Sequence, residues 1–305
     1  MKRLFKIRDN PLHPRNPRAI HIIMTTRRNF IKTTTLTAIG TAFLPHMLNA
    51  NPRKKNIGLQ LYTLRDQMNV NIPKTLNRVA EIGYTWLEAA GYGNGKFYGL
   101  APKEFKTMVD DLGMQVISSH CGFKVEESSQ VIDAHAELGV TYLVYPWMSM
   151  PETPSSDDYK KTTELFNELA NLSGNAGLKF GYHNHDFEFK KIGDTTGFDI
   201  LLNQTDPEKV CFEADFYWMV YAGVDPLEYI HKYPGRFELW HIKDMEDSPD
   251  RLFAPVGTGV IDFKRIFNDK KVSGMKYFFV EQDKCKDEPL KSVEISYKNL
   301  VSLVY

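Results

Sequence analysis

The 305-residue chain is poor in cysteine and has no excess of charge of either sign. Its three cysteines, Cys121, Cys211 and Cys285, lie far apart in the sequence, which argues against a disulfide framework and a thiolate metal site. Lys plus Arg and Asp plus Glu number 38 each, so no net charge draws the protein onto nucleic acid or an anionic membrane. We therefore expect a small-molecule partner and no nucleic acid. Cys211 lies in an apolar run and is expected in the core.

The N-terminal region has no apolar run long enough to cross a bilayer. Its mildly apolar stretch, Thr33 to Leu44, falls well short of the roughly 20 residues that a spanning helix needs. The preceding Thr26-Arg27-Arg28-Asn29-Phe30-Ile31-Lys32 is similar to the twin-arginine export motif, and Leu48-Asn49-Ala50 offers a small-residue cleavage site. We predict an extension and export signal over residues 1–50, a periplasmic or otherwise exported location, and no membrane span in the mature protein. The alternative is an amphipathic N-terminal helix of a cytosolic protein.

A dinucleotide-binding loop of the G-x-G-x-x-G type is missing after the first predicted strand. From Asn56 onward, short apolar runs alternate with longer segments of helical period, and no linker interrupts the alternation. Eight runs are predicted to be strands, at residues 57–61, 85–89, 114–118, 142–145, 178–182, 210–214, 238–242 and 277–281.

Helical segments are predicted between these strands. They include residues 73–82, 102–112, 126–138, 157–172, 226–232 and 262–268. Pro73, Pro102 and Pro226 fall in first turns, where proline is tolerated, and glycines follow the last turns of several segments. Eight strand-helix units in about 250 residues predict an α/β fold, a (β/α)8 TIM barrel, as a single domain over residues 56–305.

Ionisable side chains gather where the predicted strands end, which is where such barrels carry their reactive groups. These residues are Glu88, His120, His183, His185, Asp215, His241, Lys243 and Glu281. His183, Asp215, His241 and Glu281 follow consecutive strands, and two imidazoles with two carboxylates suit a borderline divalent ion. We expect one metal ion, Mn²⁺ first, with Co²⁺, Zn²⁺ or Mg²⁺ as alternatives. Taken singly, each histidine also fits a structural role and the aspartate a helix N-cap.

The segment His183-Asn184-His185 places its two histidines on the same side of a strand, because side chains alternate along it. His185 is therefore an alternative ligand to His183, or a group that binds substrate or transfers a proton. Glu188 is a further candidate, or it is solvated in a loop. Lys243 is expected to act in catalysis together with His185 and Glu281.

Aromatic and amide side chains near these positions are candidates for binding a sugar. Tyr62, Trp147, Trp218 and Phe123 are expected to form apolar walls, or else to pack in the ordinary way. Directional hydrogen bonds to hydroxyl groups are expected from Gln60, Asn184 and Lys243, and further polar contacts from Glu88 and His120.

The whole mature chain resembles the xylose isomerase-like barrel proteins, also called sugar phosphate isomerases/epimerases, and especially an exported branch of them. The segments that carry the resemblance are residues 58–65, 182–189, 215–218 with 222–226, 239–245, 256–263 and 279–283. In this family a glutamate, an aspartate, a histidine and a glutamate after strands five to eight bind one divalent metal, commonly Mn²⁺. The resemblance assigns the last three roles to Asp215, His241 and Glu281. His183 stands where ketose epimerases place the first glutamate.

The resemblance implies a metal-dependent sugar isomerase or epimerase that acts on a keto-sugar or 3-keto-glycoside through a metal-stabilised enediolate. Ketose epimerases use two glutamates on opposite faces of the substrate, and Glu281 alone remains of that pair. Either His183 or His185 takes over proton transfer, or the enzyme eliminates a group β to a ketone. The inosose dehydratases and the 3-keto-glycoside lyases, which run that elimination, also resemble this branch.

Other classes fit the sequence less well. An exported carbohydrate-binding barrel without catalysis is disfavoured by the retained Glu281 and both histidines. A DNA-repair endonuclease of the same fold is disfavoured by the balanced charge and the export signal. For a sugar phosphate, Gly257-Thr258-Gly259 is the single candidate phosphate site among the later loops. Whether the chain forms a homo-oligomer stays open.

Overall fold

A closed barrel of eight parallel strands forms the centre of the fold in the computed structural model, which describes residues 55–304. The predicted export signal lies outside these residues. In the order in which they pair, the strands are β1 (Gly58–Gln60), β14 (Tyr277–Val280), β11 (Leu239–Ile242), β10 (Val210–Asp215), β7 (Lys179–His183), β6 (Tyr142–Tyr145), β5 (Gln115–His120) and β2 (Trp86–Ala89). The predicted (β/α)8 barrel is confirmed.

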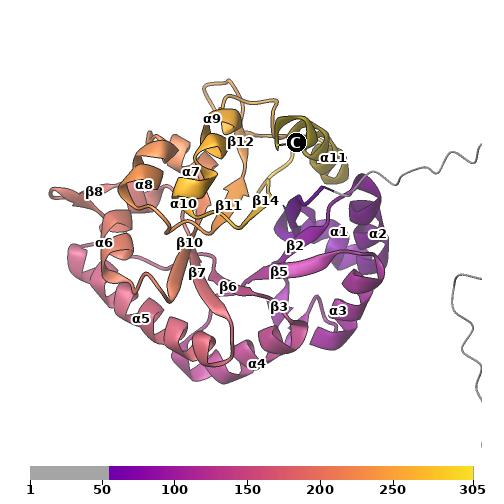
Figure 1. The fold of residues 1–305 in the computed structure, drawn as a ribbon, viewed down its shortest axis with the longest axis horizontal. Coiled ribbons are helices and arrows are strands. Elements are labelled where there is room, and N and C mark those ends of the chain that lie inside the picture. The colour runs from indigo at the N-terminus through magenta and orange to yellow at the C-terminus, as the bar shows by residue number, and fades with distance from the viewer. Residues whose placement is uncertain (1–54, 305) are drawn as a thin grey trace, which may run out of the picture. The chain divides into compact units, whose positions relative to one another are not determined.

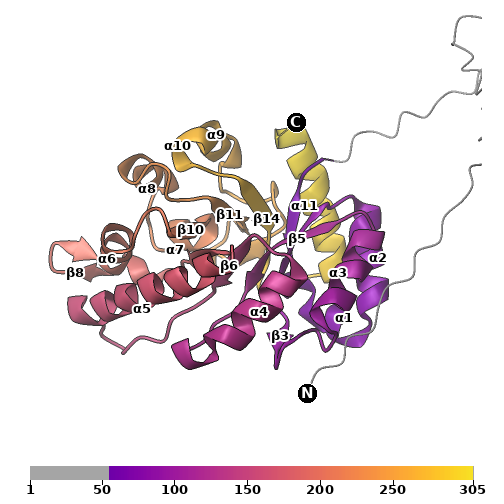
Figure 2. The ribbon, with the colours of Figure 1, turned by 60° about the horizontal axis from the view of Figure 1, so that its bottom comes forward.

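Helices lie outside the strands all the way round the barrel (Figures 1 and 2). They are α1 (Arg65–Val70), α2 (Ile72–Ile82), α3 (Pro102–Asp111), α4 (Ser128–Leu138), α5 (Ser156–Asn175), α6 (Gly197–Gln204), α7 (Phe216–Tyr221), α8 (Pro226–Lys232), α9 (Phe263–Asn268), α10 (Lys270–Ser273) and α11 (Pro289–Val304). Among the described residues, no helix combines the length and apolarity that crossing a membrane requires.

Local sequence signals set the helix ends. The side chain of Asn71 accepts a hydrogen bond from the backbone of Lys74 at the start of α2, and Ser155 forms a capping box with Asp158 at the start of α5. Gly83 ends α2 in the left-handed region, with φ of 120°, where a residue with a Cβ atom is strained. Local residues at the helix ends therefore determine where α2 and α5 begin and where α2 stops.

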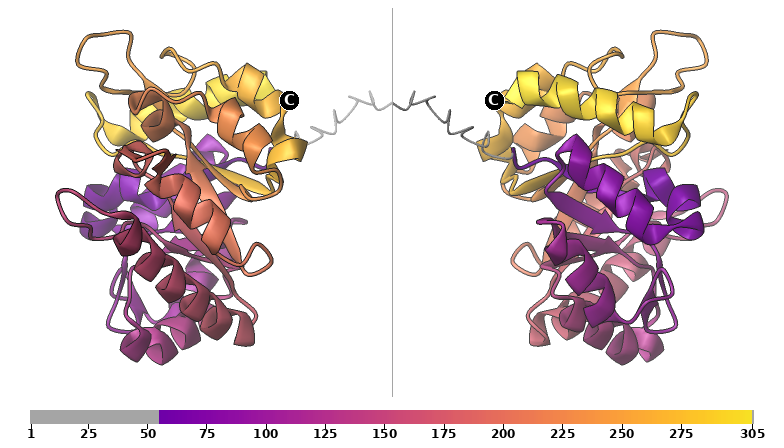
Figure 3. Two further views of the ribbon diagram at one scale, coloured as in Figure 1. Left: turned by 90° about the vertical axis from the view of Figure 1, so that its left-hand side faces the viewer. Right: turned by 90° about the vertical axis from the view of Figure 1, so that its right-hand side faces the viewer.

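The last helix, α11, packs against α2 and so completes the ring of helices next to its beginning (Figure 3). The hydroxyl of Tyr84 donates a hydrogen bond of 2.7 Å to the backbone oxygen of Val293, and Arg78 pairs with Glu294 at 3.0 Å. These contacts pack α11 against the N-terminal part of the described chain, and β1 pairs directly with β14.

The barrel interior is built in layers of different chemistry. The lowest layer is apolar and contains Ile117, Tyr142, Val144, Cys211, Leu239 and Phe279. Because side chains alternate along a strand, the residues two and four places after Cys211 also point inward, and these are Glu213 and Asp215. The upper layers are therefore polar and buried, and Cys211 lies in the core as predicted.

Candidate metal centre and active-site pocket

Four predicted ligands meet at the C-terminal end of the barrel. His183 ends β7, Asp215 ends β10, His241 lies in β11 and Glu281 follows β14. One donor atom from each lies within 4.8 Å of the others, and all four side chains are buried. The sequence prediction that these residues converge therefore agrees with the geometry of the barrel mouth.

Asp215 uses its two carboxylate oxygens in different ways. Oδ1 accepts a hydrogen bond of 3.0 Å from the backbone of Trp218 and so caps α7. Oδ2 lies 3.2 Å from Nε2 of His183 and faces the site. The helix-capping role and the ligand role are therefore compatible, since each takes its own oxygen.

The ammonium group of Lys243 lies among the same carboxylates. Its Nζ atom is 2.9 Å from Oδ2 of Asp215, 2.7 Å from Oε2 of Glu281 and 3.0 Å from Oδ2 of Asp283. Although burial alone would lower it, the three carboxylates raise the pKa of Lys243 well above its usual value. Lys243 is therefore a fixed positive charge beside two of the candidate ligands.

A buried imidazole nitrogen without a hydrogen-bond partner gives independent support for a divalent ion between the four residues. Nδ1 of His241 is buried and makes no hydrogen bond among the described residues, although Oε2 of Glu281 lies 2.9 Å away. A lone pair directed at a carboxylate oxygen is unfavourable unless a cation or proton lies between them. Two imidazoles, one aspartate and one glutamate form the mixed nitrogen and oxygen set that Mn²⁺, Co²⁺ or Zn²⁺ accepts.

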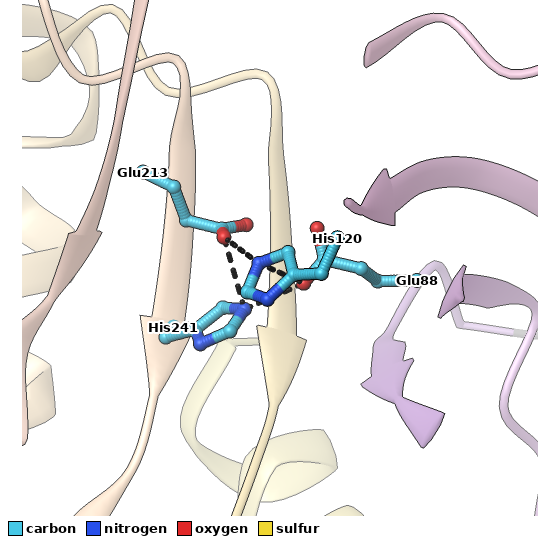
Figure 4. A group of neighbouring side chains, drawn as sticks. All are labelled: Glu88, His120, Glu213 and His241. Atoms are coloured by element: carbon cyan, nitrogen blue, oxygen red, sulfur yellow. Dashed lines mark hydrogen bonds and ion pairs between the residues drawn. The ribbon is translucent and has the colours of Figure 1, made fainter. Parts of the chain in front are cut away.

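The opposite nitrogen of His241 faces a second group of side chains one layer deeper (Figure 4). Nε2 lies 2.6 Å from Oε2 of Glu88 and 3.2 Å from Oε2 of Glu213. Nε2 of His120 lies 2.6 Å from the same oxygen of Glu213 and 3.2 Å from that of Glu88. These carboxylates orient the His241 ring so that Nδ1 points at the upper site.

Glu88 and Glu213 are completely buried, and their charges act on one another. Burial and the neighbouring Glu213 raise the pKa of Glu88, and burial raises the pKa of Glu213 to about 7. Gln60 and Ser118 donate hydrogen bonds to the two oxygens of Glu88. The position of this carboxylate is therefore fixed by protein donors.

His185 follows β7 and is held by a buried carboxylate. Its backbone N–H donates to both oxygens of Glu188, at 3.1 and 3.0 Å, and the hydroxyl of Tyr182 also donates to Glu188. Burial raises the pKa of Glu188 to about 7 and lowers the pKa of His185 to about 2. Glu188 is thus a buried group that shapes this loop, and the imidazole of His185 is neutral, with a buried Nδ1 that has no partner in the described structure.

A pocket of about 570 Å³ opens above the four candidate ligands, within the roughly 300–1,000 Å³ typical of small-molecule sites. Its walls include the aromatic rings of Tyr62, Tyr92, Phe123 and Trp147 and the ionisable groups of His120, His183, His185, Glu281 and Asp283. Trp147 is 54% exposed and Tyr62 41% exposed, and the guanidinium of Arg65 lies over one face of the Tyr62 ring, 4.4 Å from its centroid. No lysine or arginine lines this pocket in residues 55–304.

The structure places the predicted substrate-binding residues at three depths. Tyr62 and His120 line the pocket. Gln60, Glu88 and Asn184 lie beneath it, fully buried. Trp218 is not among the lining residues; its ring packs 5.6 Å from the ring of His185. The substrate-binding roles stay predictions.

The candidate phosphate loop at Gly257-Thr258-Gly259 has its backbone donors already engaged. The N–H groups of Gly257 and Gly259 both donate to Oδ2 of Asp244 at 2.9 Å, and that of Thr258 donates to the backbone oxygen of Pro255 at 3.0 Å. A buried carboxylate thus holds the amides that a phosphate would need. The loop stabilises the barrel mouth and offers no anion site.

Two residues near the site are absent from the sequence-based ligand set. Glu213 lies two residues before Asp215 on β10, and the same strand alternation that groups His183 with His185 would have found it. Asp283 lines the pocket and pairs with Lys243. Its position after β14 depends on the path of a loop, which has no periodic signal.

Comparisons with known proteins agree with the barrel fold. A model of the family described as xylose isomerase-like TIM barrel matches residues 76–291. A sugar phosphate isomerase/epimerase from Parabacteroides distasonis is 34% identical with a TM-score of 0.73, and the match covers 82% of this chain and 95% of that one. The IOLI protein, crystallised with a zinc atom, matches 82% of this chain and 98% of its own with a TM-score of 0.65, but at 16% identity shows the fold alone.

Among curated relatives, a protein named inosose dehydratase from Geobacillus thermodenitrificans is 28% identical over 202 residues, which is 54% of this chain and 67% of the relative. A Clostridium perfringens inosose dehydratase is 30% identical over 156 residues, 45% of this chain. That match spans only 52% of the Clostridium enzyme, about half its length.

Proposed function

We propose that this chain, which belongs to the xylose isomerase-like TIM barrel family, is a metal-dependent lyase. Its relatives show that it is an enzyme of the isomerase or lyase type. Its substrate would be a ring-shaped keto-sugar, keto-glycoside or keto-cyclitol without a phosphate group. The reaction would be the elimination of a group β to the ketone. The observation that carries this proposal is the residue set of the pocket, where imidazoles replace one of the two carboxylates that epimerisation requires.

Four residues would hold the ion: His183, Asp215, His241 and Glu281. A divalent ion bound there supplies Lewis-acid polarisation of a carbonyl group and stabilises the negative charge that develops when the neighbouring proton leaves. We propose Mn²⁺, because the donor set mixes two carboxylates with two imidazoles, and Zn²⁺ and Co²⁺ are the competing ions in the test. Lys243 holds the carboxylates of Asp215 and Glu281 in place beside the ion.

Proton transfer is assigned to two pocket residues outside the ligand set. His185 lines the pocket with a neutral imidazole that can accept the proton next to the ketone, although burial lowers its pKa to about 2 and makes it a weak base. Asp283 lines the pocket from the β14 side, and its carboxyl is placed to give a proton to the leaving group. One base and one acid are sufficient for elimination. Epimerisation would need both groups to act on the same carbon from opposite faces.

The absence of lysine and arginine from the lining of this pocket supports an unphosphorylated substrate, because phosphate is normally bound by such cations or by free backbone amides. The amides of Gly257 and Gly259 are engaged by Asp244. The exposed faces of Tyr62 and Trp147 would instead contact the C–H faces of a ring. The names of the inosose dehydratases, which act on a keto-cyclitol, support the same substrate class.

We also propose that the enzyme works outside the cytoplasm. The support is the sequence from Thr26 to Ala50, with the adjacent Arg27 and Arg28, which lies outside the described residues. Replacing both arginines with lysine should leave the protein in the cytoplasmic fraction if the twin-arginine route carries it. Equal export of both forms would contradict this location.

The experiment that tests the proposed reaction follows the products in D₂O. Purified protein loaded with Mn²⁺, Zn²⁺ or Co²⁺ is incubated with a 3-keto-glycoside, an inosose, a free ketose and a ketose phosphate. Nuclear magnetic resonance should show an unsaturated or cleaved product from the first two, and none from the phosphate. His185→Asn should lower turnover at least a hundredfold while keeping its metal. Deuterated epimers without any unsaturated product would contradict the lyase assignment and favour an epimerase.

A further inference from the structure

A second set of ligand atoms lies directly beneath the first, and His241 belongs to both sets. Glu88, His120, Glu213 and His241 each contribute one oxygen or nitrogen, and these four atoms lie within 4.8 Å of one another. Figure 4 shows that they come from four different strands and point toward a common centre. Three of the side chains are fully buried, and that of His120 is 10% exposed.

The distances between these atoms resemble those around a tetrahedral ion. Metal–ligand bonds of about 2.0–2.2 Å separate neighbouring ligand atoms by a little over 3 Å. Two of the nitrogen–oxygen distances are 3.2 Å, from His120 to Glu88 and from His241 to Glu213. The other two are 2.6 Å and would lengthen by about 0.7–1.0 Å on binding of a tetrahedral ion, within reach of side-chain rotation.

The surroundings of this set are those of a metal site rather than of an ordinary ion pair. Donors outside the set orient Glu88, since Gln60 donates to Oε2 at 2.7 Å and Ser118 to Oε1 at 2.5 Å. The other oxygen of Glu213, Oε1, is buried without a hydrogen-bond partner in the described structure. A fully buried carboxylate oxygen that lacks a donor is costly unless a cation lies nearby.

The balance of charge in the upper barrel also requires more cations than the side chains provide. Five carboxyl groups face one another across the two layers, and one lysine, Lys243, lies among them. The five belong to Glu88, Glu213, Asp215, Glu281 and Asp283. With all five carboxyl groups ionised, one divalent ion in the upper site would leave an excess of negative charge.

We propose that Glu88, His120, Glu213 and His241 form a second divalent-cation site, and that the His241 ring releases its N–H proton to solvent and bridges the two ions as an imidazolate. Nδ1 of His241 faces the upper ligands and Nε2 faces the lower ones. The lower ion balances the buried carboxylates and fixes the ring that the upper ion needs. It has no place for substrate, because only His120 of the four lines the pocket. This inference rests on the proposed function in one respect: it takes from it that the upper site binds a divalent ion.

The test is the number of ions per chain in the full-length protein at saturating Mn²⁺ or Zn²⁺, measured by elemental analysis after gel filtration. We expect two ions in the wild type, one in Glu213→Gln and one in Asp215→Asn. Glu238→Gln serves as the matched control, because this glutamate bonds to Tyr142 at the lower end of the barrel and should leave two ions bound. With Mn²⁺, electron paramagnetic resonance should show coupled ions in the wild type and isolated ions in both single-site variants.

The outcomes separate this inference from the proposed function. One ion in the wild type that Asp215→Asn removes and Glu213→Gln retains overturns the lower site and leaves the upper one intact. No ion in the wild type overturns both. Circular dichroism establishes that the variants fold, and His120→Gln replaces Glu213→Gln if the latter does not. An unchanged count of two ions in a folded lower-site variant also contradicts the assignment.

Discussion

At the scale of single residues, Lys243 decides how strongly the upper site attracts a cation. Its ammonium lies 2.7 and 2.9 Å from oxygens of Glu281 and Asp215, both candidate ligands. A fixed positive charge at that distance repels a divalent ion, yet it also holds the ligand carboxylates in position. In the proposed site, Lys243 and the divalent ion would therefore compete for the same oxygen atoms.

We predict that Lys243→Met binds Mn²⁺ at least tenfold more tightly than the wild type, because the competing charge is removed. Turnover should fall by a hundredfold or more, because the carboxylates of Asp215 and Glu281 lose the charged group that holds them in position. Competition with a metal-sensitive dye measures the affinity. Lys298→Met, which removes an exposed lysine paired with Glu294, is the control. Weaker Mn²⁺ binding in Lys243→Met than in that control would show that Lys243 does not oppose the ion.

Glu188 predicts a pH dependence of stability. Burial raises the pKa of this carboxyl to about 7 in the folded protein, above its value in the unfolded chain. The stability that it contributes is fully present below the unfolded pKa and is lost as the pH rises through about 7. In Glu188→Gln, the free energy of unfolding should therefore fall less between pH 5 and pH 8 than in the wild type. Urea unfolding at both pH values measures the free energies. An identical change in the free energy of unfolding between pH 5 and pH 8 in the two proteins would contradict the raised pKa.

Residue identity alone did not reveal which polar groups are buried together. The sequence placed His183, Asp215, His241 and Glu281 at the barrel mouth because each follows a predicted strand, a local signal. Glu213 lies inside a strand otherwise made of apolar and small residues, where a charged side chain is expected to face away from the core. Strand alternation from Asp215 gives its inward direction, but the residues that it meets inside the barrel follow only from the register of the strands.

At the scale of elements, strands were predicted to within one or two residues, because apolar runs and the residues that end them are local features. Short apolar helices were not predicted from the sequence. Helix α6 (Gly197–Gln204) buries six of its residues, so it lacks the polar face whose period identifies a helix in sequence. The small hairpins in the loops, such as β12 (Asp244–Met245) with β13 (Phe253–Ala254), depend on tertiary contacts for the same reason.

The loop after β11 packs so closely around Gly259 that even a small side chain at this position should destabilise the protein. A Cβ atom on Gly259 would lie 2.2 Å from the backbone oxygen of Met245 and 2.4 Å from Oδ1 of Asp244. Gly259→Ala should therefore lower the free energy of unfolding by about 2–4 kcal/mol, since backbone or a buried carboxylate must move. Gly93→Ala is the control, because no atom lies within 4 Å of its added Cβ. Thermal unfolding of both variants decides, and equal midpoints would contradict the close packing at Gly259.

At the scale of the whole barrel, the apolar lower layer and the charged upper layers have separate roles. The lower layer, with Cys211, Leu239 and Phe279, supplies ordinary core packing. The upper layers bury carboxylates and imidazoles that would be costly without cations. This division explains why the fold was predictable from apolar patterns, whereas the chemistry of the site required the relative positions of strands that are far apart in sequence.

The central claim is that the barrel mouth holds a divalent ion between His183, Asp215, His241 and Glu281. The most direct test is anomalous diffraction from a crystal of the Mn²⁺-loaded protein. We predict an anomalous peak about 2.0–2.3 Å from Nε2 of His183, Nδ1 of His241 and one oxygen each of Asp215 and Glu281. The absence of a peak there at full Mn²⁺ saturation, with Lys243 still bridging the two carboxylates, would contradict the claim.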